Sequence, residues 1–211
     1  MLGHMGSFAS PNADSTTKPL DLYIHGYISS RLMRLPEGPP PSTDGQDTGL
    51  PVCVSAAHLD GIVLALTPFH NSMNYRSAVL HGYAQPVTDS DEKLWAMQLI
   101  TEGIIPGGWD SARVPPTKAE LQSTQILRVQ IKSASAKVRT GGPSEDRKDL
   151  KDEELRKRVW TGVVPVWENW GEPMKAEENE KEGGLPEYIR QVGEHGNEAR
   201  RAYAERAVRE A

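Results

Sequence analysis

The apolar runs of this chain are short, and glycine and proline separate them. The longest runs, around Ile62 and Val79, have the length of a strand, and none reaches the roughly 18 uncharged residues that a membrane-spanning helix needs. Nineteen glycines and sixteen prolines are spread along the 211 residues. This punctuation favours short strands joined by turns over a helical bundle. We therefore predict a mainly β, soluble protein with no membrane partner.

Charge and cysteine content narrow the partners and the compartment. The formal net charge of −5 comes from 24 basic and 29 acidic residues, whereas a general nucleic-acid binder carries a basic surface. The single cysteine, Cys53, cannot form an internal disulfide, and Met1 is not followed by the basic and apolar regions of a secretory leader. These features predict a cytoplasmic protein without a nucleic-acid partner.

The periodicity of apolar residues predicts an order of strands and helices. Strands are expected at 20–28, at 52–57 and 62–66, at 76–87 and at 126–131. Asp60-Gly61 predicts a tight turn that pairs the second and third of these strands. Helices are expected at 29–35, from Thr88 or Asp89 to Gly103, and after the Thr117-x-x-Glu120 capping box.

Composition divides the chain into three parts. Residues 1–19 are polar and rich in glycine and proline, which predicts a loop or frayed terminus. Residues 20–170 contain the predicted strands and form the core domain. Residues 171–211 read as an acidic, glycine-rich linker followed by a charged helix from Leu185. The thin apolar stripe of that helix favours a solvated appendage over a helix that packs on the core.

The common catalytic signatures are absent from the sequence. It has no Gly-x-Ser-x-Gly elbow, no Walker loop, no Gly-x-Gly-x-x-Gly after a strand and no His-Glu-x-x-His. Four histidines, His25, His58, His70 and His81, lie in or beside predicted strands without the spacing of metal ligands. We therefore predict no metal site.

Two polar segments concentrate hydrogen-bonding side chains at strand ends. In residues 25–31, a strand runs into a helix start that carries Ser29, Ser30 and Arg31, and these are donors that a phosphate group needs. The alternative is that a serine only caps the helix and Arg31 faces solvent. The second segment, residues 69–77, is unusually rich in polar side chains for a plain turn.

These segments, in this order, resemble the pyridoxamine 5′-phosphate oxidase-like flavin-binding split barrels. The likeness is to the branch of flavin-nucleotide-binding proteins that includes nitroimidazole-resistance proteins, and it runs from about Leu20 to Trp167. The matching segments are residues 22–26 with Ser30-Arg31, 60–65, 69–77, 106–110 and 135–141.

The resemblance implies an antiparallel split β-barrel of α+β class with a few peripheral helices. Such proteins are usually homodimers that hold FMN at the subunit interface. Relatives also begin with a helix and barrel strands before the part that matches Leu20. We therefore expect a barrel without its usual N-terminal strands, in which the strand at 20–28 has an unpaired edge.

The resemblance also assigns roles to individual residues. His25 and Gly26 match positions along the flavin, and Ser29, Ser30 and Arg31 match the turn that binds the FMN phosphate. The remaining matches are Asn74, Tyr75, Arg76 and Ser77 beside the isoalloxazine, Lys137 and Arg139 in the basic strand that closes the site, and His70 near the substrate. For Arg76, a structural salt bridge is the alternative.

The implied function is that of an oxidoreductase acting on a small organic substrate, because FMN supplies redox chemistry. Two other interpretations stay open. One is a non-catalytic flavin-binding or scaffold protein. The other is a protein without FMN that uses the pocket for heme or for a cofactor-free reaction.

Overall fold

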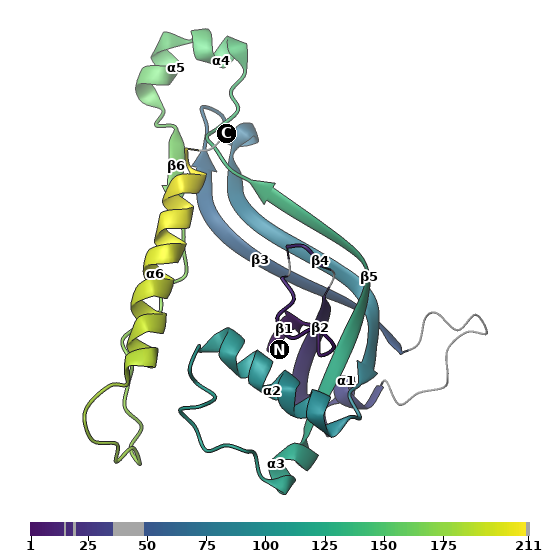
Figure 1. Cartoon of the computed structure of the whole chain (residues 1–211). Coiled ribbons are helices and arrows are strands. Elements are labelled where there is room, and N and C mark those ends of the chain that lie inside the picture. The colour runs from purple at the N-terminus through teal and green to yellow at the C-terminus, as the bar shows by residue number, and fades with distance from the viewer. Residues whose placement is uncertain (15, 19, 36–48, 210–211) are drawn as a thin grey trace, which may run out of the picture. The chain divides into compact units, whose positions relative to one another are not determined.

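The computed structural model describes residues 1–211 except 15, 19, 36–48 and 210–211 (Figure 1). It contains a six-stranded sheet of order β1-β2-β5-β4-β3-β6. The strands are β1 (Gly3–Gly6), β2 (Asp21–Tyr27), β3 (Leu50–Leu64), β4 (Ser72–Pro86), β5 (Thr124–Arg139) and β6 (Gly162–Pro165). β2 pairs antiparallel with β1 and β5, and β3 pairs antiparallel with β6. The predicted antiparallel, mainly β fold of α+β class is confirmed.

The helices are α1 (Arg31–Arg34), α2 (Ser90–Ile104), α3 (Lys118–Ser123), α4 (Arg147–Lys151), α5 (Glu153–Arg158) and α6 (Glu187–Ala207), and a 3₁₀ turn spans Pro68–His70. Two of the helices, α2 and α6, are long, and each of the others spans at most six residues. Among the described residues, no helix has the length and apolar character to cross a membrane.

The chain forms two compact units. Unit 1 comprises Met1–Val54 and Val79–Ala134, and unit 2 comprises Ser55–Ala78 and Ser135–Ala211. The three long strands, β3, β4 and β5, contribute residues to both units.

Unit 1 has a cluster of buried side chains on each face of β2 and β5, because alternate residues of a strand point to opposite faces. Leu22 and Ile24 belong to one buried cluster, which also contains Met33 of α1. Tyr23 belongs to the other, in which Ala96 of α2 is fully buried. Helix α2 covers this second face and also contacts β1 (Figure 1).

A buried carboxylate ties α2 to the sheet of unit 1. The Tyr23 hydroxyl donates to Glu92 Oε1 at 2.8 Å, and Arg128 Nη1 donates to the same oxygen at 3.0 Å. Burial and the hydrogen bond to Glu92 raise the pKa of Tyr23, so that this phenol stays neutral. Because all three groups have partners, the network satisfies polar atoms that the core would otherwise leave unpaired.

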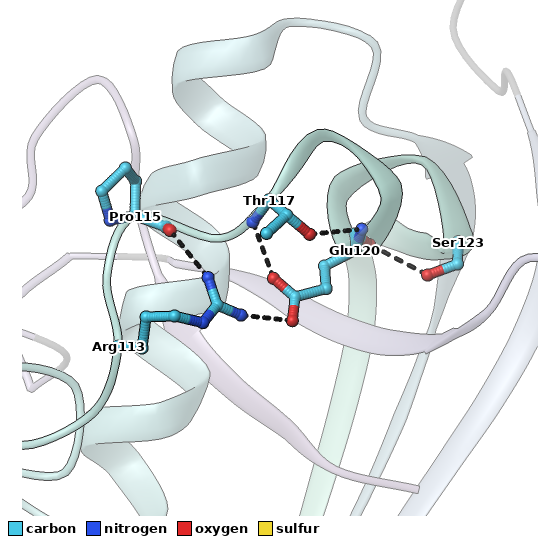
Figure 2. Close-up of polar contacts among 5 residues, drawn as sticks. All are labelled: Arg113, Pro115, Thr117, Glu120 and Ser123. Atoms are coloured by element: carbon cyan, nitrogen blue, oxygen red, sulfur yellow. Dashed lines mark hydrogen bonds and ion pairs between the residues drawn. The ribbon is translucent and has the colours of Figure 1, made fainter.

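The predicted capping box of α3 is present (Figure 2). Thr117 Oγ1 accepts from the Glu120 N–H at 3.3 Å, and Glu120 Oε2 accepts from the Thr117 N–H at 2.6 Å. The Arg113 guanidinium also forms an ion pair with the Glu120 carboxylate. These contacts satisfy N–H groups that the first turn of a helix leaves free.

The N-terminal segment departs from the prediction of a loop or frayed terminus. Strand β1 lies there and pairs with β2 in a register that runs from Gly3 opposite Ile24 to Gly6 opposite Asp21. The expected unpaired edge at 20–28 is therefore wrong, since β2 has β1 on one side and β5 on the other. Backbone pairing with β2 forms this strand without an apolar pattern of its own.

The predicted hairpin at Asp60-Gly61 is also wrong, because β3 runs unbroken through these residues. Asp60 is buried, and both of its carboxylate oxygens accept from Arg76. Gly61 faces β6, where an added Cβ would lie 2.8 Å from Val163 Cγ1. The Asp and the Gly thus serve an ion pair and a close strand approach, not a turn.

Unit 2 contains the C-terminal helix α6, which lies alongside β6 (Figure 1). The residues of α6 are exposed or half-buried except Ala204 and Ala207 near its end, which are buried. The interpretation of this helix as a solvated appendage is therefore wrong for its last turns, which pack within unit 2.

Candidate functional site

The turn from β2 into α1 in unit 1 holds the predicted phosphate-binding residues. The Ser30 N–H donates to the Tyr27 carbonyl at 2.8 Å, and the Met33 N–H donates to the Ser30 carbonyl at 3.1 Å. Gly26 permits this turn to fold back on the strand, because an added Cβ would lie 2.6 Å from Met33 Cε. The turn is therefore fixed by backbone bonds and by the buried Met33.

Two buried polar atoms at this turn have no hydrogen-bond partner among the described residues. They are His25 Nδ1 on β2 and Ser30 Oγ before α1. Ser30 occupies the N-cap position, yet its side chain makes no capping bond. A buried polar atom without a partner costs about 1–3 kcal/mol, so such atoms call for an explanation.

The side chains at this turn suit an oxygen-rich anion. Ser30 can donate one hydroxyl hydrogen, and the exposed guanidinium of Arg31 follows directly. The alternation of β2 places His25 on the Tyr23 face, opposite to the face on which Met33 packs. Ser29 is exposed beside Ser30. A hydroxyl and a guanidinium are the donors that phosphate groups commonly receive in proteins.

Three other candidate residues, Asn74, Arg76 and Arg139, lie together in unit 2 and are held by the protein itself. Arg76 Nε and Nη2 donate to Asp60 at 3.0 and 2.8 Å, and the pKa of Arg76 is raised mainly by this hydrogen bonding. Arg139 Nη1 donates to Oδ1 of the fully buried Asn74. The salt bridge considered for Arg76 is therefore present.

The remaining candidates of β4 alternate with this buried pair. Tyr75 and Ser77 are half-buried, and strand geometry directs them to the face opposite Asn74 and Arg76. Lys137 on β5 is exposed. Among the four candidate residues of β4, Asn74 and Arg76 bond to the segment around Gly141 and to Asp60, and Tyr75 and Ser77 lie on the other face.

His70 closes the 3₁₀ turn before β4 and lies beside an acidic residue. Its Nε2 is 3.6 Å from Asp146 Oδ2, an ion-pair distance that exceeds a hydrogen bond. The ring stacks edge-on against Phe69, whose side chain is 91% exposed. Among the described residues, no group of three or more His, Cys, Asp or Glu side chains is placed to hold a metal ion.

Two residues that organise unit 2 were missed from the sequence. Asp60 was interpreted as a turn residue, and Tyr203 was assigned only to the thin apolar stripe of the terminal helix. Asp60 carried one usable signal, because an acidic residue directly before the β-branched run at Ile62 needs a cation when it is buried. Tyr203 carried none, since its contact depends on the docking of α6.

Comparison with known proteins identifies the family. The family model described as pyridoxamine 5′-phosphate oxidase matches residues 15–138, more than half of the chain. The FAD- and heme-binding protein from Mycobacterium smegmatis is 31% identical, with a TM-score of 0.69 over 82% of this chain and 77% of that one.

A second solved structure gives a similar result. The flavocytochrome Anf3 from Azotobacter vinelandii is 26% identical, with a TM-score of 0.67 over 90% of this chain and 83% of that one. A search of the curated proteins found no match. The motif order, the sheet and the family model agree: this chain belongs to the pyridoxamine 5′-phosphate oxidase family.

Proposed function

We propose that this protein binds FMN and acts as a flavin-dependent oxidoreductase on a small organic substrate. The observation that carries the proposal is the buried, unpartnered Ser30 Oγ at the β2–α1 turn, next to the exposed Arg31. A flavin phosphate placed there would accept from Ser30 and from Arg31, and so remove the cost of the unpaired atom. The similarity to a FAD-binding protein and to a flavocytochrome supports a flavin as the ligand.

In this proposal the chain supplies binding and orientation. The bound flavin would supply the electron transfer, which no side chain of the protein can perform in its place. Arg31 and Ser30 would hold the phosphate end, and His70 would lie near the substrate, as the family resemblance assigns it. The exposed Lys137 is also proposed to contact the flavin, as a cation beside an anionic ligand.

We propose further that the protein is a cytoplasmic homodimer. In support, residues 55–59 of β3 and 135–138 of β5 are all exposed, so that no other part of the described chain covers either face of these strand segments. A second copy could bury them. The exposed thiol of Cys53 suits a reducing compartment.

The first test is the absorption spectrum of the purified full-length protein. The proposal predicts a yellow protein whose released cofactor has the mass of FMN, and whose colour bleaches with a nicotinamide donor. A yellow protein that no donor reduces would support the flavin-binding scaffold instead. Release of FAD would correct the nucleotide, and a colourless protein that takes up neither flavin would contradict the proposal.

A second candidate function is heme binding, favoured by the surroundings of His70. Asp146 lies on the Nε2 side of the ring, so Nδ1 is the nitrogen that faces away from this carboxylate. A histidine whose far nitrogen faces a carboxylate is a common arrangement for a metal ligand. The similar protein from Mycobacterium smegmatis is described as binding heme as well as FAD, and the one from Azotobacter vinelandii is described as a flavocytochrome.

The heme candidate is tested by adding hemin and recording the Soret band. We expect a shifted, saturable Soret band in the wild type that His70→Ala abolishes. His58→Ala is the matched control, because His58 is an exposed histidine of β3 in the same unit. An unchanged band in His70→Ala would remove His70 as the ligand.

A further inference from the structure

The end of α6 contacts the strand that carries four of the candidate flavin residues. The Ala207 carbonyl accepts from the Gly141 N–H at 2.8 Å and from Asn74 Nδ2 at 3.3 Å. Asn74 Nδ2 also donates to the Gly141 carbonyl at 3.0 Å. The fully buried Asn74 therefore joins β4, the segment after β5 and the last turn of α6.

Arg76, two residues along β4, is clamped between two groups. Its guanidinium donates twice to Asp60, and its Cζ lies 3.5 Å from the centroid of the Tyr203 ring on α6. Stacking on an aromatic face and bidentate pairing are geometries in which a guanidinium cannot be replaced by an ammonium group. Arg76 therefore has one fixed position as long as α6 is docked.

The clamp acts on the covered side of β4 and leaves the other side open to a ligand. Asn74 and Arg76 point toward α6, so that Tyr75 and Ser77 point away from it. These last two are among the four residues that the family resemblance assigns to the flavin ring, and unit 2 leaves them half-buried. Docking of α6 thus fixes the backbone from which both side chains project.

We propose that Tyr203 is a positioning residue of the flavin site, acting through Arg76 on the stretch Asn74–Ser77. The inference rests on the proposed flavin-binding function. It makes α6 part of the support of the cofactor site, through its contacts with Asn74 and Arg76. A side chain that holds its neighbours within a fraction of an ångström raises affinity by reducing the ordering cost of binding.

The test compares Tyr203→Leu with Tyr203→Phe in the full-length chain. Tyr203→Leu removes the aromatic face, whereas Tyr203→Phe keeps it. We expect Tyr203→Leu to weaken FMN binding by about tenfold and to change the visible circular dichroism of the bound flavin. Tyr203→Phe should keep both properties. Tyr188→Leu, at the other end of α6, is the matched control and should bind FMN like the wild type.

A second variant covers the case in which Tyr203→Leu fails to fold. Arg76→Lys keeps the charge beside Asp60 but loses the stacking on Tyr203, so it should weaken FMN binding to a similar degree. Where Tyr203→Leu folds, adding it to Arg76→Lys should cause no further loss, because the two residues act through one contact.

The outcomes separate this inference from the proposed function. If the wild type binds FMN and Tyr203→Leu lowers only the melting temperature, with the flavin affinity and dichroism unchanged, Tyr203 is a structural residue and the inference is wrong. If the wild type binds no flavin at all, the proposed function fails and this inference fails with it.

Discussion

At the scale of single residues, Glu120 offers a pH-dependent test of the structure. Hydrogen bonds from Arg113 and Thr117 lower the pKa of this carboxyl from 4.5 to about 2. A carboxyl whose pKa is lower in the folded state stabilises the fold at pH values above its pKa in the unfolded chain. That contribution is lost as the pH falls from about 4.5 through about 2. We expect urea unfolding to show this loss in the wild type and a smaller one in Glu120→Gln. If the free energy of unfolding falls equally with pH in the two proteins, the contacts of Figure 2 are contradicted.

The ion pair between Asp60 and Arg76 gives a second residue-scale prediction. Asp60→Asn should lower the free energy of unfolding by about 1.5–3 kcal/mol, because it weakens two hydrogen bonds to a charged group. The Arg76 side chain is 35% exposed, so solvent screening places the expected loss in the lower part of this range. Urea denaturation measures it, with Asp110→Asn at an exposed site as the control. A loss no greater than that of the control would contradict the pair.

Arg76 also shows what single residues could not reveal beforehand. An arginine in a strand suits a phosphate or a carboxylate equally, and the choice depends on which group the fold brings near it. Here the partner is Asp60, whose Asp-Gly sequence predicts a turn. Arg31 is exposed beside Ser30, which is where a phosphate-binding arginine and a solvent-facing one would both lie, so the choice for Arg31 is made by titration with FMN.

At the scale of elements, α2 depends on its N-cap. The Asp89 carboxylate accepts from the N–H groups of Asp91 and Glu92 at 3.0 and 2.7 Å. Asp89→Ala should destabilise unit 1 by about 0.5–2 kcal/mol, measured by thermal unfolding. Ser90→Ala, an exposed neighbour, should change the stability little. Equal effects of the two substitutions would show that the cap contributes nothing.

The helices were easier to predict than the strands. The capping residues Asp89 and Thr117 and the prolines and glycines beyond the helices are local signals, and the structure confirms α2 and α3 at those positions. Strand β1 and the continuity of β3 depend on partners distant in the sequence. Such pairing can impose a strand on Gly3–Gly6, and it can carry β3 through an apparent turn.

At the scale of the whole molecule, the role of the tail can be tested by deletion. The buried Ala204 and Ala207 and the bonds of the Ala207 carbonyl predict that removing residues 171–211 loosens unit 2. We expect amide hydrogen exchange around Asn74–Arg76 to accelerate by more than about tenfold, while amides around Leu22–Ile24 in unit 1 stay protected. Unchanged exchange in unit 2 would restore the interpretation of the tail as an appendage.

The family could be predicted at this scale because many weak motifs occur in one order. No single motif, such as Ser30-Arg31, would have sufficed, and the family model and the two similar structures agree with the combined pattern. The docking of α6 was not predictable, because its charged sequence shows only a thin apolar stripe, and its contacts are made by small alanines, a backbone carbonyl and one ring on Arg76.

The central claim is that the β2–α1 turn binds a flavin phosphate, and calorimetric titration with FMN tests it most directly. Arg31→Ala is compared with Arg34→Ala, since both arginines are exposed on α1 and only Arg31 adjoins Ser30. The account predicts that Arg31→Ala weakens FMN binding by about 10- to 100-fold, while Arg34→Ala binds like the wild type. Equal affinities in the wild type and both variants would contradict it.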